Sequence, residues 1–286
     1  MAERYQPFDP RQYMSRPDFE VFHSHDPQAP DIDLHHHDFY EVYVFISGQV
    51  EYRVEGHIDN LEPGDVLLIS PMELHQLMVK ESQSVYERFV LWIDRDYLER
   101  FSTAEASLTR CFDHSLDSHT NLLRPTPVQR ADILSRLDAL VRESHSGDYA
   151  SELAAAGILV QLMVLINRMV LDCDKQEAHD GASPLISGVL GYINQHYNEA
   201  ISLDELALRF YVSKYHLSHE FRKVVGTGVY RYITLKRLLI AKQLLSSGIS
   251  PGVAYSHCGF NDYANFYRAF KARYGISPKE CVTGSV

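Results

Sequence analysis

Cysteine is scarce in this chain of 286 residues, and the few cysteines that it has lie far apart. Cys111, Cys173, Cys258 and Cys281 form no CxxC pair, so the sequence offers neither a zinc ribbon nor the disulfide framework of a small secreted protein. Isolated thiols of this kind are typical of the reduced cytoplasm.

Long apolar runs are also missing. The most apolar segment, Gly157 to Ile166, is interrupted by Gln161 and is too short to cross a bilayer. The first residues, MAERYQPFDPRQY, are polar and charged, unlike the apolar core of a secretory signal. We therefore expect a cytoplasmic protein with no membrane partner.

An excess of positive charge, the usual mark of a DNA-binding protein, is missing from the chain as a whole, whose formal net charge is −11. The charge is unevenly divided, however. Residues 182–286 contain 12 Lys and Arg against 6 Asp and Glu, a net of +6, and residues 1–181 contain 15 against 32, a net of −17. Attraction to phosphate is therefore expected of the last hundred residues alone.

Length and composition predict two domains, because 286 residues of which 45% are apolar and 23% charged can form two separate cores. The segment CDKQEAHDGAS is polar, contains glycine and has little periodicity, which is typical of a linker. We expect a first domain over residues 1–173, a linker over 174–183 and a second domain over 184–286.

The first domain is predicted to begin with β-structure. Residues 1–30 show little periodicity and are interpreted as an arm. Between about Leu34 and Asp94, the expected strands YEVYVFI, VEYRV, VLLIS and SVYERFVLWI alternate with turns, among them EGHIDN. Strands this short predict a sandwich or barrel. Between about Thr126 and Cys173, two amphipathic stretches predict helices, and the second is apolar enough to be buried against the barrel, a twin subunit or both.

The second domain is predicted to contain seven helices, because capping residues mark the start of each. Ser202 with Glu205 forms a capping box for the second helix, and Gly275 ends the sixth. The expected helix starts are Pro184, Ser202, Ser213, about Val229, Ser250-Pro251, Asn261 and Ser277-Pro278.

One helical stripe occurs twice in this domain. Leu217 and Phe221 form an apolar edge on the third helix, and Phe266 and Phe270 form the same edge on the sixth, forty-nine positions later. A basic and aromatic edge lies beside each, as contact with the major groove requires. The candidate DNA-binding residues on these edges are Lys214, Tyr215, Ser218, His219, Arg222, Tyr263, Ala264, Tyr267, Arg268 and Lys271.

The connecting helix, at about 1.5 Å per residue, would span roughly 27 Å. It would hold two helix-turn-helix units about one turn of DNA apart, roughly 34 Å. A single pair of helices is compatible with any helical hairpin, and a plain helical bundle is the alternative. Two copies on the basic half of the chain favour DNA binding.

The second domain resembles the AraC/XylS family of bacterial transcription regulators over about residues 184–283. The resemblance rests on SLDELALRFYVSKYHLSHEFRKVVGTGVYRYITLKRLLIAKQLL and GFNDYANFYRAFKARYGISPKE, above all on the GF-N-D…F-x-R-x-F-K run and the YGISP end. It implies two helix-turn-helix units, usually activating transcription with RNA polymerase as a partner. In one departure, Tyr255 stands where the family usually has a small Ala, and Ala254 lies one place earlier. A looser second unit is therefore expected.

A histidine pattern, H-x-H-x3-E-x6-G, covers residues 35–48 of the first domain. On a strand, two His side chains with one residue between them point the same way, and Glu41 is expected to project inward with Tyr43. His75, after the next expected strand, is placed to act as a fourth ligand. Such groups suit iron, manganese, zinc or nickel.

This pattern resembles the first motif of the cupin fold, in which such residues bind a divalent metal. The second motif, Pro71–His75, fits less well. In the regulators resembled above, such a front domain usually binds an effector. Three hypotheses stay open: a metal site, a pocket for a polar effector, which we favour, and a polar cluster without a ligand.

The residues attached to these hypotheses include one further pair. Arg88 and Trp92 lie four apart on one expected strand, so they share a face and are a candidate clamp for a sugar or carboxylate. A core tryptophan beside a surface salt bridge is the alternative. The candidate effector-binding residues are His35, His37, Glu41, Tyr43, His75, Arg88 and Trp92. If a metal is present, the expected ligands are His35, His37, Glu41 and His75.

Together these patterns predict an α+β protein with a cupin-like barrel, dimerisation helices and an all-α double helix-turn-helix domain. The expected function is that of a homodimeric activator, without catalytic activity or cofactor, that binds double-stranded DNA and responds to a small molecule. A sugar is the expectation from the family. The alternatives are a metal-dependent cupin enzyme or metal sensor fused to a helical module, and a regulator without a ligand.

Overall fold

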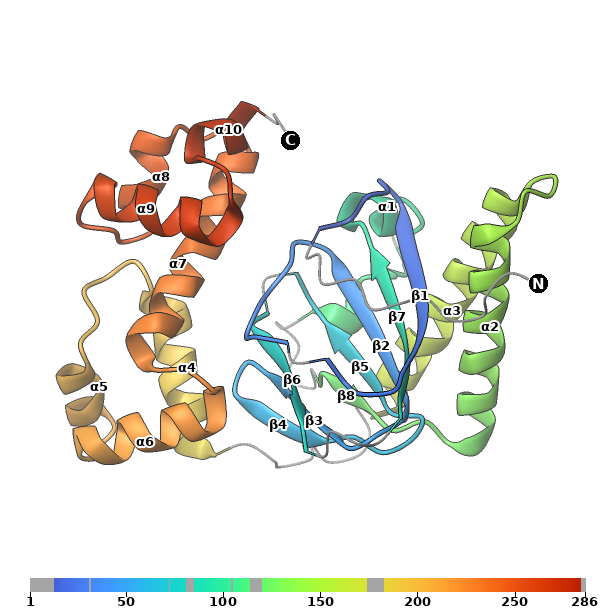
Figure 1. The fold of residues 1–286 in the computed structure, drawn as a ribbon, viewed down its shortest axis with the longest axis horizontal. Coiled ribbons are helices and arrows are strands. Elements are labelled where there is room, and N and C mark those ends of the chain that lie inside the picture. The colour runs from blue at the N-terminus through green and yellow to red at the C-terminus, as the bar shows by residue number, and fades with distance from the viewer. Residues whose placement is uncertain are drawn as a thin grey trace. The chain divides into compact units, whose positions relative to one another are not determined.

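The computed structural model describes residues 13–30, 32–71, 73–80, 85–103, 105–113, 120–173 and 183–283. The chain forms two compact units, a β-rich one from Met1–Val54 with Ile58–Gly181 and a helical one from Ala182–Val286 with Glu55–His57. Figure 1 shows the first in blue to green and the second in yellow to red. The expected linker, 174–183, lies outside the described residues except for Ser183.

Strands of the first unit form two sheets. The larger has the order β1-β7-β2-β5-β8, with antiparallel neighbours, and the smaller has the order β4-β3-β6. Their bounds are β1 Phe19–Asp26, β2 Tyr40–Ser47, β3 Val50–Val54, β4 His57–Asn60, β5 Val66–Ile69, β6 His75–Val79, β7 Tyr86–Ile93 and β8 Leu122–Leu123.

Alternation along the strands divides the interior into two layers. On β2, Tyr43 and Phe45 face the second sheet, where they join a core that contains Tyr52. Val42 and Val44 face the opposite way, into a core shared with the helices. The pleat of a strand sends successive side chains to opposite faces, so a strand covered on both sides is apolar throughout. The cupin-like α+β architecture expected from the sequence is confirmed.

Two long helices cover the outer face of the larger sheet (Figure 1). They are α2 Pro127–His145, with a capping box at Thr126 and Gln129, and α3 Ser151–Cys173; the shorter α1 Arg95–Glu99 and the 3₁₀ turn η1 Arg110–Phe112 precede them. By length and composition alone α3 would be long enough to cross a membrane, although the sequence suggested too short a run. The apolar window within Ser151–Asp172 has a mean hydropathy of 1.9, and 44% of this window is buried within the chain.

The structure corrects the predicted N-terminal arm. Phe19–Asp26 is a strand, β1, paired along its whole length with β7. Residues 19–21, 23 and 24 are buried, so both faces are covered over most of the strand, and it lacks the alternation by which an exposed strand is recognised. The expected turn EGHIDN likewise contains β4, a short polar strand at the edge of its sheet.

The helical unit contains the seven expected helices within its described residues, 183–283. They are α4 Pro184–His196, α5 Leu203–Arg209, α6 Lys214–Val225, α7 Val229–Ser246, α8 Pro251–His257, α9 Tyr263–Tyr274 and α10 Pro278–Thr283. Ser202 and Ser213 cap α5 and α6 as predicted. Asn261 does not cap α9. Asp262 does, because its carboxylate accepts from the amides of Ala264 and Asn265.

Helix α7 contributes to the cores of both halves of this unit. Leu238, Ala241 and Leu245 belong to the core that α8 and α9 complete. Nearer its start, the ring of Tyr232 meets Phe221 of α6 edge-on, 5.6 Å between centroids. The two helix-turn-helix units therefore share one rigid element.

Arg237 of α7 is hydrogen-bonded to the segment that follows α4, and its guanidinium lies 6.0 Å from the ring centroid of Phe260, after α8. Its guanidinium donates to the carbonyl oxygens of Tyr197 and Glu199, at 2.7 and 2.6 Å. The adjacent chain comes so close that a Cβ on Gly259 would lie 2.5 Å from the carbonyl oxygen of Asn198. Gly259 also has a φ of +77°, which glycine adopts without strain.

Candidate functional site

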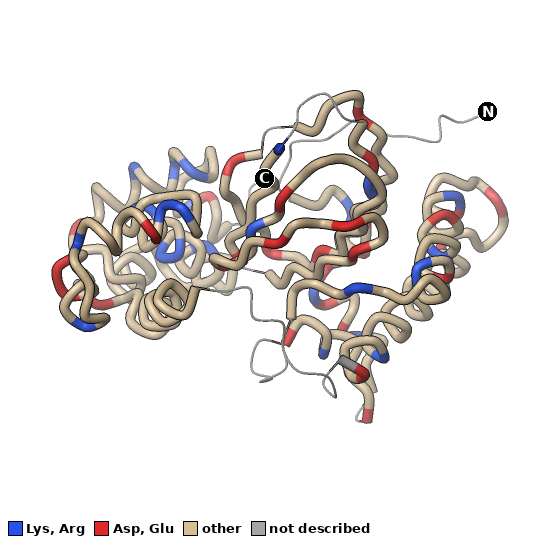
Figure 2. Tube along the Cα trace, turned by 90° about the horizontal axis from the view of Figure 1, so that it is seen from below, with Lys and Arg blue, Asp and Glu red and all other residues tan. Residues whose placement is uncertain are grey.

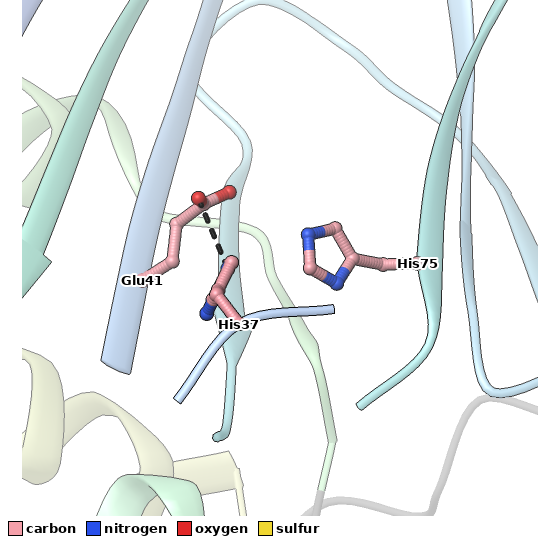
Figure 3. Close-up of side chains that lie close together, drawn as sticks. All are labelled: His37, Glu41 and His75. Atoms are coloured by element: carbon pink, nitrogen blue, oxygen red, sulfur yellow. Dashed lines mark ion pairs between the residues drawn. The ribbon is translucent and has the colours of Figure 1, made fainter. Parts of the chain in front are cut away.

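Three side chains with metal-ligand chemistry converge inside the β-rich unit. Candidate ligand atoms of His37, Glu41 and His75 all lie within 4.8 Å of one another. His37 precedes β2, Glu41 lies on β2, and His75 begins β6 in the other sheet, so its ring faces the first two across the interior (Figure 3). All three are buried.

Backbone carbonyls fix the orientation of the histidine rings. Nδ1 of His37 lies 2.9 Å from the carbonyl oxygen of Phe39, and Nδ1 of His75 lies 2.9 Å from that of Glu73. His35 is anchored in the same way to Asp33. A carbonyl only accepts, so each Nδ1 carries a proton and Nε2 keeps its lone pair in the neutral ring.

Glu41 is held by donors on both of its oxygens. Trp92 donates its indole N–H to Oε2 at 2.8 Å, and the Tyr52 hydroxyl donates to Oε1 at 3.4 Å. Oε2 also lies 3.3 Å from Nε2 of His37. Burial raises the pKa of this carboxyl, but His37, His35 and the Trp92 hydrogen bond together outweigh it, so the net pKa lies below its ordinary value.

Burial favours the uncharged form of the other titratable groups of this interior. It lowers the pKa of His75 well below its ordinary value, with His35 and His37 nearby adding to the effect, so His75 is a neutral acceptor near pH 7. The hydroxyls of Tyr43 and Tyr86 share a hydrogen bond of 2.6 Å. Burial raises the pKa of Tyr86 to about 12 and raises that of Tyr43 well above its ordinary range, so both stay protonated.

The second candidate site consists of the two striped helices, α6 and α9. Their apolar edges are fully buried, with Leu217, Phe221, Phe266 and Phe270 at 0% exposure. Eight of the ten candidate DNA-binding residues are exposed, while Ser218 and Tyr267 are half-buried. The predicted division of each helix into a buried and a solvent-facing edge is therefore present.

Electrostatics in the two units follows the division of charge along the chain. Figure 2 shows Lys and Arg repeatedly along the helical unit and many Asp and Glu on the β-rich unit. Lys214, at the start of α6, forms an ion pair with Asp204 of α5. On α9, Nη2 of Arg268 donates to the side-chain oxygen of Asn265 at 2.5 Å. The exposed faces of both helices thus carry cations suited to phosphate.

Comparison with known families matches both units. The model of the AraC-like ligand binding domain matches residues 16–163, just over half of the chain, and a helix-turn-helix domain model matches residues 206–283. The chain belongs to the AraC family of transcription regulators. Members of this family pair a ligand-binding domain with a DNA-binding one, so this chain is an effector-responsive DNA-binding regulator.

Similar proteins match the chain along most of its length. The transcriptional activator RhaS of Escherichia coli O157:H7 is 22% identical over 263 residues, covering 91% of each chain. RhaS of Escherichia fergusonii is 25% identical over 253 residues, covering 87% of each. Among solved structures, fatty acid-bound ToxT of Vibrio cholerae is 12% identical and covers 94% of this chain and 96% of its own, with a TM-score of 0.40.

The barrel of this AraC-family chain brings only some of the candidate effector residues together. Trp92 joins the His37–Glu41–His75 group through Glu41. The ring of His35 lies 4.1 Å from that of His75, but His35 falls outside the three-residue group. It is also not on a strand, since its single bridge to His75 precedes β2.

Arg88 and Tyr43 belong to a neighbouring network. Arg88 forms an ion pair with Asp26 of β1 and stacks over the ring of Tyr86, 4.3 Å from its centroid. Tyr86 in turn is bonded to Tyr43. Arg88 and Trp92 both lie on β7, and their printed partners differ, since Arg88 is bonded to Asp26 and Trp92 to Glu41. The joint clamp for a sugar or carboxylate stays a prediction.

Sequence reasoning missed three residues of this interior. Tyr52 could have been predicted from the alternation of VEYRV, in which its position points inward. Tyr86 shares a face with Arg88 by the same two-residue period. Asp26 gave no signal, because it lies in the segment that was predicted to be an arm.

Proposed function

We propose that α6 and α9 are the recognition helices of an activator that binds duplex DNA in the cytoplasm and does so without catalysis. The single observation that carries the proposal is the pair of exposed basic and aromatic edges, each backed by a fully buried apolar pair. Exposed Lys214, Arg222, Arg268 and Lys271 would contact phosphate or guanine. The proposed activator role is supported by similarity to the transcriptional activator RhaS. RNA polymerase is proposed as the partner from the resemblance to the AraC/XylS family.

Selection of duplexes from a random pool by the full-length chain tests this function. We expect enrichment of two short elements about one helical turn apart, matching two recognition helices on one chain. Binding of the selected duplex should weaken steeply with salt, since phosphate contacts release counterions. Failure to enrich any sequence over several rounds, with folded protein, would contradict the proposal.

Dimerisation is proposed to use the solvent-facing side of α3. This side carries Leu153 and Leu171, which are 77% and 42% exposed. Val160 and Val164 lie between them in the sequence and are partly buried at the edge of the core. These positions follow the spacing of an apolar seam between two helices. The opposite side of α3 is occupied by the core shared with α2 and the larger sheet.

Sedimentation of exposed-leucine variants tests this interface. Leu153→Glu and Leu171→Glu should shift the chain from dimer to monomer, because each places a charge in the seam. Val128→Glu is the matched control, since Val128 is 80% exposed on the first turn of neighbouring α2. Equal behaviour of all three variants would contradict a seam on α3.

The effector is proposed to be a small polar molecule, a sugar being one class, that enters the β-rich unit. Tyr43, Tyr52 and Trp92 offer aromatic faces, and Glu41 with the histidines offers hydrogen-bonding groups. A thermal-shift screen of sugars and hydroxy acids tests this proposal. A hit is expected to change the affinity of the chain for its selected duplex. No stabilisation by any compound, or stabilisation without a change in DNA affinity, would count against it.

A further inference from the structure

A strained backbone position lies in the turn between α5 and α6 of the helical unit (Figure 1). Tyr211 has a φ of +55°, and it is the only residue other than glycine with a positive φ among residues 183–283. A left-handed backbone brings the Cβ atom of an L-residue too close to a carbonyl oxygen, so a bulky residue is rare there. Because residues held in such conformations cluster at functional sites, Tyr211 is a candidate for a functional role.

The second helix-turn-helix unit shows what this position otherwise requires. The turn after α8 is closed by the same three backbone hydrogen bonds as the turn after α5, each forty-eight positions later along the chain. Gly259, with a φ of +77°, therefore corresponds to Tyr211. A Cβ on Gly259 would lie 2.5 Å from the carbonyl oxygen of Asn198, so the second turn has no room for a side chain. The first turn has that room, and an aromatic ring occupies it.

The ring of Tyr211 contributes little to the stability of the fold. Tyr211 is 95% exposed, so folding removes almost none of its apolar surface from water. Packing therefore explains neither the strained backbone nor the choice of an aromatic residue. Glycine would adopt the same backbone without strain, as Gly259 does in the second unit. A ring that strains its own backbone and lies in water indicates a contact with a partner.

The charges around this turn fit a negatively charged partner. Residues 206–219 contain no Asp or Glu, and the exposed cations Arg209 and Lys214 lie on either side of Tyr211 in the sequence. Lys214 forms an ion pair with Asp204, which lies in the first turn of α5, at the opposite end of that helix from Tyr211. The segment that leads into α6 is therefore basic and aromatic, a combination that suits the sugar–phosphate backbone of DNA.

We propose that Tyr211 is a further DNA contact, made by the first helix-turn-helix unit alone, in which its hydroxyl donates to a phosphate oxygen beside the groove that α6 enters. The inference rests on the proposed use of α6 as a recognition helix. The N-terminal residues of such a helix contact base edges, so the turn just before it lies beside the backbone of the duplex. Tyrosine hydroxyls are among the groups that contact phosphate, and Gly259 has no side chain with which to do so.

Three substitutions in the full-length chain separate the contact from the strain. Tyr211→Phe removes only the hydroxyl, Tyr211→Ala removes the ring but keeps the Cβ, and Tyr211→Gly removes both. Affinity for the selected duplex, measured by fluorescence anisotropy, should fall about ten-fold in all three, because a hydrogen bond to a charged group is lost. The melting temperature of Tyr211→Gly should stay the same or rise, because glycine adopts a left-handed backbone without strain. A purely structural role would instead lower it.

The pattern of the loss identifies the group that Tyr211 contacts. Phosphate carries no sequence information, so affinity should fall equally for the selected duplex and for its single-base variants. A neutral hydroxyl displaces no counterion, so the salt dependence of Tyr211→Phe should match that of the unchanged chain, whereas Lys214→Ala should reduce the salt slope by about 1. Tyr149→Ala is the matched control, since Tyr149 is a fully exposed tyrosine of the β-rich unit and its loss should leave affinity unchanged.

Two results would overturn the proposal. One is an affinity of Tyr211→Phe and Tyr211→Gly for the selected duplex equal to that of the Tyr149→Ala control, which would mean that the ring serves a protein partner or none. The other is a loss confined to one base position, which would make Tyr211 a base contact. Either result would leave the proposed regulatory function in place, because the unchanged chain would still bind its duplex. A folded chain that selects no duplex would lose both the function and this contact.

Discussion

The two helix-turn-helix units of the helical domain have the same frame but different electrostatic surroundings. The proposed recognition helices α6 and α9 both contain 12 residues, and each ends at a left-handed glycine, Gly226 or Gly275. The preceding helices differ: α5 carries Asp204 and Glu205 in its first turn, whereas α8, PGVAYSH, has no carboxylate. The arrangement of helices is therefore duplicated, whereas the carboxylates of α5 have no counterpart in α8.

The largest expected effect comes from the buried pairs, and it tests whether the two frames are equivalent. Phe221→Ala and Phe270→Ala each remove a fully buried ring, which costs about 3–5 kcal/mol of unfolding free energy. Chemical denaturation of the full chain measures both losses. Because α7 contributes to both cores, we expect similar values. A loss of under 1 kcal/mol for Phe270→Ala would show that the second frame is loosely packed.

The next effect concerns the exposed edges. Arg268→Ala and Arg222→Ala should each weaken binding to the selected duplex, by about 1–3 kcal/mol where the arginine contacts a base. Fluorescence anisotropy on the selected duplex and on single-base variants measures this. A residue that contacts a base loses discrimination at one position, and one that contacts phosphate loses affinity for all sequences equally. Unchanged affinity in both variants would contradict the assigned edges.

Removal of the helix caps is expected to have a smaller effect on stability, and one that differs between the two helix-turn-helix units. Ser213 accepts from one amide of α6, whereas the carboxylate of Asp262 accepts from two amides of α9 and carries a charge at the positive end of the helix. Substitution by Ala should therefore cost about 1 kcal/mol at Ser213 and up to about 2 kcal/mol at Asp262. Thermal denaturation compares the two. The reverse order would show that the Asp262 bonds contribute little in solution.

Capping chemistry and helical periodicity made most of the helical unit predictable. Pro184, Ser202 and Ser213 each act on the first turn of their own helix. Helices α4, α5 and α6 therefore begin where these residues predict. At α9 the predicted cap was wrong by one residue. Asn261 and Asp262 are both residue types that cap helices, and only the backbone geometry shows that Asp262 is the cap.

The β-rich unit was less predictable, because its organisation depends on pairing between distant segments. Strand β1 is buried on both faces over most of its length, so its period disappears, and its paired residues on β7 lie 60 to 74 positions later. The contacts of the candidate site in this unit were incompletely predicted for the same reason. Glu41 and His75 were found from their residue types, but the Trp92–Glu41 bond and the separate Arg88–Asp26 pair follow from the register of three strands, β1, β7 and β2.

The smallest expected effect bears most directly on the difference in charge between the two helix-turn-helix units. Asp204 pairs with Lys214 at the start of α6, although both side chains are more than half exposed. Exposed pairs contribute little to stability, so Asp204→Asn should leave the melting temperature nearly unchanged. It should raise affinity for the selected duplex about two- to five-fold at low salt, because Lys214 is released and a charge that repels phosphate is removed.

Glu205→Gln is the matched control for this variant, since it removes the same charge from the next position of the same helix. If the pair with Lys214 matters, Asp204→Asn gains more affinity than Glu205→Gln, and the additional gain disappears when Lys214 is also replaced by Ala. Equal gains in the two single variants would mean that only the overall charge of α5 distinguishes the two units. The specific pairing of Lys214 would then have no part in DNA binding.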